Sequence, residues 1–254
     1  MQPKDRLASA IRAPKRGRTV ARMPYVVSGW PDREGFASFL DDVAEMADAI
    51  EVGVPFSDPM ADGPVIAQAA RDAVNAGVTL PWILEVLGER ERPAPTVLMS
   101  YLNPLEAYGL ERLVTDAKAA GVCGFIVPDL PFEEGDELQQ LCDEAGMGLV
   151  QLVTPVTPTD RLRRLGRVTG GFVYAVTVTG ITGTSAKEGT LGPYLSRVKA
   201  ACEAPVCAGF GIRSKADIEA LEGVADGAIV GTALIRELAS GGYEGGRAFL
   251  AGLG

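Results

Sequence analysis

The chain of 254 residues contains no histidine. Without an imidazole it can form neither a serine–histidine nor a cysteine–histidine pair, and it cannot hold zinc through histidine. Proton transfer must then fall to carboxylates, tyrosine, lysine or cysteine. The six lysines lie outside every segment that we interpret as a strand, which argues against a Schiff-base lysine.

Cysteine is scarce, and long apolar runs are absent. The four cysteines show no paired spacing of the metal-binding kind, so we predict buried thiols in a reducing compartment and no metal site. No run approaches the roughly 18 apolar residues of a membrane span. The first residues, MetGlnProLysAspArg, lack the apolar core of a signal peptide. We therefore expect a cytoplasmic protein that does not bind membranes.

Basic residues are fewer than acidic ones, with 24 Lys and Arg against 33 Asp and Glu, which gives a net charge of −9. This balance argues against binding to nucleic acid or to anionic membranes. It does not exclude a small anionic substrate, because backbone amides can hold a phosphate locally.

Short apolar runs alternate with longer amphipathic stretches along the whole chain. Near-continuous apolar strands are typical of a parallel sheet that is covered on both faces. The expected strands are 23–28, 49–54, 96–100, 124–128, 148–153, 172–178, 205–208 and 227–230. The expected helices are 5–12, 33–48, 106–120, 133–145, 158–165, 191–202 and 214–221, with two more within 55–95.

Eight strands that are each followed by helix predict an α/β fold, a single (β/α)8 TIM barrel with an N-terminal extra helix. Residues 1–254 are expected to form one domain. The chain has no GlyXGlyXXGly motif after the first strand and no P-loop, which disfavours an open nucleotide-binding sheet. The charges of the basic connector after the first helix, up to residue 22, are interpreted as a solvated surface.

The second expected strand carries a carboxylate, Glu51, in the middle of an apolar run. A buried charge costs several kcal/mol unless it is compensated, and perturbed acids cluster at functional sites. Glu51 is therefore either a catalytic group or a buried Glu paired with an Arg or with backbone amides. In the first case burial raises its pKa, whereas Asp62 in the following loop stays ionised if that loop is hydrated. Asp58 either caps a turn or helix or touches a partner.

Glycines follow three late strands, in the segments 179–183, 209–212 and 231–234. Glycine lets backbone N–H groups approach an oxyanion, and a helix start adds its dipole. Many barrels bind phosphate with the loops after strands seven and eight. The pattern predicts a phosphate site at these loops.

Aromatic side chains stand at or near the ends of several expected strands. A flat apolar portion of a substrate would stack on such groups, although ordinary barrel packing accounts for each of them singly. The residues are Tyr25, Tyr101, Tyr174 and Phe210.

The segment IleGluValGlyValProPheSerAspProMetAlaAspGly, residues 50–63, resembles the signature of the tryptophan synthase α subunit family. The resemblance extends through most of the chain. It includes MetProTyrValValSerGlyTrpPro at 23–31, MetSerTyrLeuAsnPro at 99–104, ValProAspLeuPro at 127–131, the loop at 179–183, GlyPheGlyIle at 209–212 and GlyThrAla at 231–233.

The resemblance implies cleavage of indole-3-glycerol phosphate to indole and glyceraldehyde 3-phosphate. It implies that Glu51 is the general acid–base and that Asp62 holds the indole N–H. The implied indole pocket consists of Tyr25, Tyr101, Tyr174 and Phe210. The residues implied to bind the rest of the substrate, with its phosphate, are Thr182, Gly183, Gly211, Gly231 and Thr232.

No cofactor is expected in this chain, because the resemblance implies that pyridoxal phosphate belongs to a partner β subunit in an α2β2 assembly. Three alternatives stay open. One is a stand-alone lyase that releases free indole. The second is a catalytically weak regulatory subunit, against which the intact Glu51 and Asp62 argue. The third is another phosphate-binding barrel, such as a sugar isomerase, which the lack of a suitable acid pair on other strands disfavours.

Overall fold

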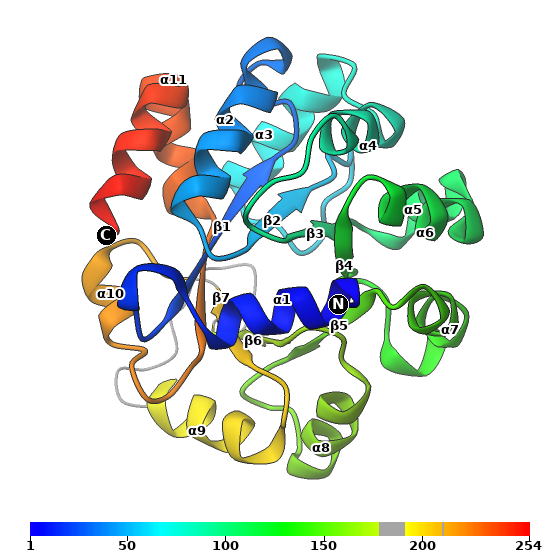
Figure 1. Cartoon of the computed structure of the whole chain (residues 1–254), viewed down its shortest axis with the longest axis vertical. Helices are drawn as coiled ribbons and strands as arrows, with labels where there is room; N and C mark the ends of the chain where they lie inside the picture. The colour runs from blue at the N-terminus through cyan, green and yellow to red at the C-terminus, as the bar shows by residue number, and fades with distance from the viewer. Residues whose placement is uncertain (178–190, 210) are drawn as a thin grey trace.

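A computed structural model describes residues 1–177, 191–209 and 211–254. Within these ranges eight parallel strands close into a barrel in chain order, and the last strand pairs with the first (Figure 1). The predicted barrel is thereby confirmed. The strands are β1 (Ala21–Val27), β2 (Ile50–Gly53), β3 (Thr96–Met99), β4 (Val122–Ile126), β5 (Gly148–Val153), β6 (Val173–Val176), β7 (Val206–Gly209) and β8 (Gly227–Val230).

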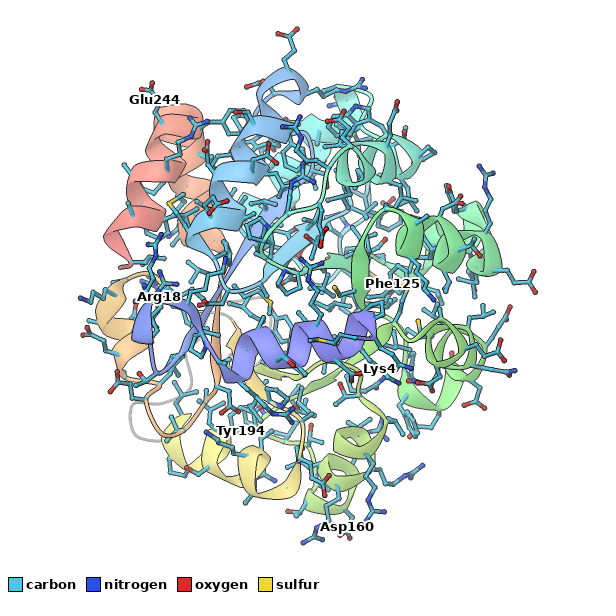
Figure 2. The ribbon with its side chains drawn as sticks, viewed as in Figure 1. Lys4, Arg18, Phe125, Asp160, Tyr194 and Glu244 are labelled. Carbon is cyan, nitrogen blue, oxygen red and sulfur yellow. The ribbon has the colours of Figure 1, made fainter. Side chains whose placement is uncertain are left out.

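Helices surround the barrel, and charged side chains such as Asp160 and Glu244 point outward from them (Figure 2). The described helices are α1 (Pro3–Arg12), α2 (Arg33–Met46), α3 (Pro64–Asn75), α4 (Leu80–Gly88), α5 (Leu102–Tyr108), α6 (Leu110–Ala119), α7 (Asp136–Ala145), α8 (Thr159–Val168), α9 (Leu191–Ala201), α10 (Lys215–Glu219) and α11 (Thr232–Gly252), with short 3-10 turns η1 (Lys15–Gly17) and η2 (Phe132–Glu134). None of these helices is long and apolar enough to cross a membrane.

The expected N-terminal helix is present as α1, which lies across the barrel in Figure 1. It covers the end at which the strands begin. Lys4 N donates to Gly146 O just before β5, and Leu7 packs against Gly171 just before β6. Leu7 and Ile11 are fully buried. The opposite end, where the strands finish, is therefore the end left for a site.

Two predicted helices are wrong in extent. The expected helix 106–120 is two helices, because Gly109 between them has a φ of +92°, a backbone conformation that favours glycine. The expected helix 133–145 is a 3-10 turn followed by α7, which begins at Asp136. Amphipathic spacing reports which residues are buried and does not report a change of direction between two helices.

The prediction of a solvated basic connector is also wrong at Arg18, which is labelled in Figure 2. Its side chain is 8% exposed and pairs with the fully buried Asp48, with 3.2 Å between Nη1 and Oδ2. The same carboxylate accepts backbone hydrogen bonds from Lys15 N at 2.7 Å and Arg22 N at 2.8 Å. A buried carboxylate needs such partners, and here they come from a distant part of the chain.

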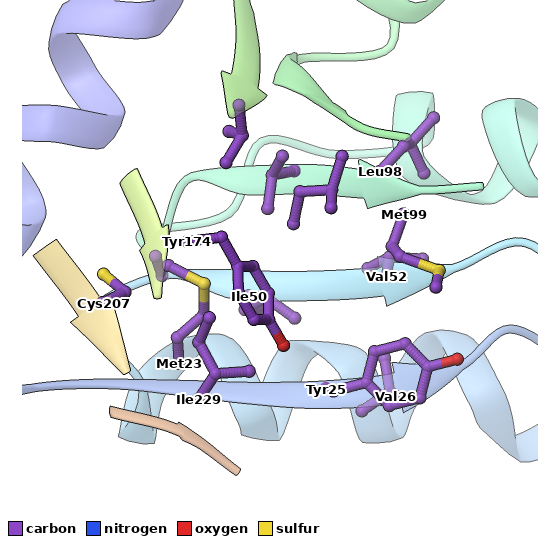
Figure 3. Close-up of a cluster of buried hydrophobic side chains, with 14 of the residues drawn as sticks. Met23, Tyr25, Val26, Ile50, Val52, Leu98, Met99, Tyr174, Cys207 and Ile229 are labelled. Atoms are coloured by element: carbon purple, nitrogen blue, oxygen red, sulfur yellow. The ribbon is translucent and has the colours of Figure 1, made fainter. Parts of the chain in front are cut away.

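Tyr25 and Tyr174 lie among buried apolar side chains (Figure 3). Glycines on neighbouring strands make room for both rings. A Cβ built on Gly53 would lie 2.4 Å from the hydroxyl of Tyr25. A Cβ built on Gly209 would lie 2.4 Å from Cε1 of Tyr174. Tyr25 on β1 is in register with Glu51 on β2, so the fold places an aromatic ring and the buried acid at one level of the barrel.

Candidate active site

Glu51 is a buried acid without a complete set of partners. It is 3% exposed, and its Oε2 is buried with no hydrogen-bond partner among the described residues. Burial, and then the nearby Asp62, raise the pKa of Glu51 to about 8. No Arg pairs with it in the described part of the chain, so it differs from a structural ion pair. At neutral pH Glu51 is mainly a protonated carboxylic acid that can donate its proton.

Asp62 stands in the loop between β2 and α3 and is half-buried. The hydroxyl of Tyr101 donates a hydrogen bond to its Oδ2 at 3.1 Å. Burial raises the pKa of Asp62 to about 6, and the Tyr101 bond acts in the opposite direction. The condition set for an unshifted Asp62, a hydrated loop, is met only in part, because burial raises the pKa of this carboxyl. Asp62 is still mostly ionised at neutral pH.

Tyr25 and Tyr174 enter the same region from β1 and β6. Burial raises the pKa of both phenols well above their usual value, and the charges of Glu51 and Asp62 add to the effect. Both phenols are therefore neutral at any physiological pH. The Tyr25 hydroxyl has no hydrogen-bond partner among the described residues, so it can donate to a bound molecule. The structure thus brings together four of the predicted site residues from three strands and one loop.

Tyr101 contacts the loop that carries Asp62. Its ring is 1% exposed and lies against Phe56, with 5.4 Å between ring centroids. Its hydroxyl accepts from Ala61 N at 2.9 Å while it donates to Asp62. Tyr101 therefore positions the Asp62 loop. Sequence reasoning missed Phe56, although this residue lies within the 50–63 segment.

Residues 11–247 match the family model of the tryptophan synthase alpha chain. The chain belongs to the tryptophan synthase alpha chain family. Among similar proteins, the alpha chain of Nitratidesulfovibrio vulgaris strain DP4 is 44% identical over 244 residues, covering 94% of both chains. That of Prochlorococcus marinus strain NATL2A is 40% identical over 235 residues, covering 91% of this chain and 87% of the relative. Membership in the tryptophan synthase alpha chain family implies a lyase activity in tryptophan biosynthesis.

Solved structures of tryptophan synthase share the fold over almost the whole chain. The structure from M. tuberculosis in its open form has a TM-score of 0.88 at 32% identity and covers 98% of this chain and 96% of that chain. The tryptophan synthase a2b2 complex from Pyrococcus furiosus gives 0.85 at 34% identity, with coverage of 92% and 97%.

The predicted phosphate loops of this alpha chain family member are only partly described. Thr182, Gly183 and Phe210 lie outside the described residues. Gly211 is exposed with a φ of +85°. Gly231 and Thr232 form the start of α11, where no side chain caps the helix. A Cβ built on Gly231 would lie 3.5 Å from Cβ of Tyr25. The start of α11 therefore lies next to one of the candidate site residues.

Asp58 is exposed and accepts a hydrogen bond from its neighbour Ser57. In the same loop Met60 is 68% exposed. Within the described residues no group of three His, Cys, Asp or Glu side chains could hold a metal ion.

Tyr101→Phe tests the positioning role of Tyr101. We expect kcat to fall about tenfold, because one lost hydrogen bond is worth about 1 kcal/mol and Ala61 N is left unpaired. The pKa of Asp62 should rise further, since the lost bond lowers it in the intact protein. The matched control is Tyr108→Phe, which removes a phenol bonded to the surface carboxylate of Asp116 at 2.6 Å. Equal effects of the two variants would contradict the assignment.

Proposed function

We propose that the chain cleaves indole-3-glycerol phosphate to indole and glyceraldehyde 3-phosphate by a retro-aldol reaction. The observation that carries the proposal is the pair of carboxyl groups, Glu51 and Asp62, whose environments set pKa values of about 8 and about 6. Two acids with pKa values held apart can take different roles at one pH. Membership in the tryptophan synthase alpha chain family supports this particular substrate.

The first step is proton donation by Glu51 to C3 of the indole. Protonation turns the ring into an indoleninium cation, an electron sink for the bond from C3 to the side chain. That bond breaks as its electron pair returns to the ring and the side-chain carbon becomes a carbonyl. The ionised Glu51 then accepts the proton of the side-chain hydroxyl. One proton moves from oxygen to carbon, and Glu51 is restored.

Asp62 is proposed to accept the indole N–H and to stabilise the cation through its negative charge. An oriented carboxylate of this kind acts where charge develops, in a site with little water. Tyr101 holds this carboxylate in place. The proposed indole pocket is lined by the rings of Tyr25, Tyr101, Tyr174 and Phe210.

The phosphate is proposed to lie at the loops that contain Thr182, Gly183, Gly211, Gly231 and Thr232. The uncapped start of α11 supports this location, because free N–H groups and the helix dipole both favour an anion there.

A partner β subunit is proposed to receive the indole and to hold the pyridoxal phosphate. The similarity to the tryptophan synthase a2b2 complex from Pyrococcus furiosus supports this assembly. The chemistry proposed for the present chain uses its own carboxyl groups for the proton transfers.

The direct test is to incubate the purified chain with indole-3-glycerol phosphate and to measure both products. Indole and glyceraldehyde 3-phosphate should appear in equal amounts, and faster when a β subunit is added. Indole-3-glycerol, which lacks the phosphate, is the control substrate and should react much more slowly. Absence of product with and without the β subunit would refute the proposed activity.

The pH dependence follows from the two pKa values. We expect kcat/KM to rise as the pH increases through about 6, where Asp62 loses its proton, and to fall above about 8, where Glu51 loses its proton. The measurement is initial indole release across both limbs with the chain alone. A rate that stays flat across either limb would contradict the corresponding role.

Thr232→Asp tests the phosphate site. A carboxylate at the first residue of α11 would repel the bound dianion, so we expect KM to increase about tenfold or more, as removal of a charge-assisted hydrogen bond does. Thr159→Asp is the matched control, because Thr159 is likewise the exposed first residue of a helix, α8. An unchanged KM in the Thr232 variant would place the phosphate elsewhere.

A further inference from the structure

A cavity of about 350 Å³ lies between the segment that follows β4, strand β5 and helices α7 and α8. Among the described residues that line it, none is a predicted site residue. Leu152 of β5 and Val176 of β6 line it, as do residues of both helices. A volume of this size is at the lower end of small-molecule pockets, about 300–1,000 Å³.

Gln151 on β5 lines this cavity. Its neighbour Leu152 is in register with Tyr174, which lies inside the barrel, so alternation along the strand turns Gln151 outward. The residue is 8% exposed. Its backbone N–H donates to Thr169 Oγ1 at 3.0 Å, but its carboxamide has no hydrogen-bond partner within the described part of the chain. A buried carboxamide is costly unless it is hydrogen-bonded, and the cavity is where a partner can enter.

A second carboxamide lines the same cavity from α7. Gln139 Nε2 donates to Asp143 Oδ2 at 3.1 Å, whereas its Oε1 is buried without a partner among the described residues. The remaining walls near Gln151 are apolar, with Leu149 two residues before it on the same face of β5 and Leu165 on α8. The cavity therefore combines apolar walls with unpaired amide groups.

The charges around the cavity disfavour an anion. Arg161, its one lining cation among the described residues, is paired with Glu133, with 2.9 Å between Nη2 and Oε2. Asp129 and Asp136 also line the cavity, and their carboxylates add negative charge. An uncharged molecule fits these surroundings better than a phosphate or a carboxylate does.

We propose that this cavity binds an uncharged, planar cyclic amide of one or two rings. The ring lies between Leu149 and Leu165. Its N–H donates to Gln151 Oε1, and its carbonyl accepts from Gln151 Nε2, so both halves of the buried carboxamide are satisfied. This site is separate from the Glu51–Asp62 pair and does not depend on the reaction proposed for that pair.

The test uses 2-quinolinone as the probe and the full chain as the receptor. Binding is followed by calorimetry and by the NMR signal of the Gln151 side-chain amide. We expect saturable binding that shifts this signal. N-methyl-2-quinolinone, which keeps the ring and loses the donor, should bind at least about fivefold more weakly. Gln151→Leu should lower the affinity for 2-quinolinone by a similar factor. Gln140→Leu changes a residue of α7 that does not line the cavity, and it should leave this affinity unchanged.

Three results would overturn the proposal. They are the absence of binding up to the solubility limit of the probe, equal affinity for the N-methyl analogue, and displacement of the probe by saturating indole-3-glycerol phosphate. If Gln151→Leu does not fold, as judged by circular dichroism, the comparison of the two quinolinones on the unchanged protein decides the matter. These binding measurements do not depend on the proposed lyase activity, so they can be interpreted even if the chain does not catalyse that reaction.

Discussion

Glu51→Gln is expected to lower kcat for indole release by about 10²–10⁴-fold, the contribution typical of a general acid–base group. Glutamine keeps the shape of the protonated acid that a pKa of about 8 implies at neutral pH, but it has no proton to donate to carbon. KM should therefore change little. The measurement is steady-state indole release at pH 7.

The control for this variant is Glu111→Gln, the same exchange at an exposed position of α6. It should leave kcat unchanged. Thermal unfolding of the Glu51 variant should remain close to that of the parent, since a neutral group replaces a mainly neutral group. Turnover close to that of the parent would remove Glu51 from the proposed mechanism.

Asp62→Asn is expected to reduce kcat by at least about 10²-fold, because loss of one oriented electrostatic contact costs roughly 3 kcal/mol in the transition state. The asparagine oxygen can still accept the hydrogen bond from Tyr101, so the variant isolates the charge from the positioning. The limb of the pH profile near 6 should disappear, since it belongs to Asp62.

Asp58→Asn is the matched control for this second variant. Asp58 lies in the same loop and is exposed, and within the described structure its side chain is hydrogen-bonded to its neighbour Ser57. With the chain assayed alone, the kcat of this control should match that of the parent. A persistent limb near pH 6 in Asp62→Asn would show that another group produces it.

Much of the barrel was predictable because each strand is an apolar run and each helix is amphipathic. These are local patterns, and burial on both faces of the sheet produces them directly. The same patterns misjudged residues 106–120, because the break at Gly109 changes the direction of the helix without changing its polarity. They also misjudged Arg18, whose burial depends on Asp48, 30 residues away.

In the candidate site, too, one feature was predictable from a local pattern and another depends on contacts between distant residues. An acid within an apolar strand marks Glu51 in the sequence, since a charge at such a position is costly and perturbed acids cluster at functional sites. The role of Tyr101 was not predictable in this way. Whether its hydroxyl holds a loop depends on how residues 55–63 fold back toward β3, which no local pattern reports.

The sequence by itself determined the chemistry that is possible here: without histidine, proton transfer rests on a small number of acids, and Glu51 is marked by its apolar surroundings. Only the tertiary structure decided the protonation of those acids and their neighbours. Closure of the barrel buries Glu51 and brings Asp62 beside it. The absence of a side chain at Gly53 and Gly209 leaves space for two tyrosine rings. Desolvation and nearby charges, which shift these pKa values, depend on which segments pack together in the folded protein. The order of the segments along the chain does not specify that packing.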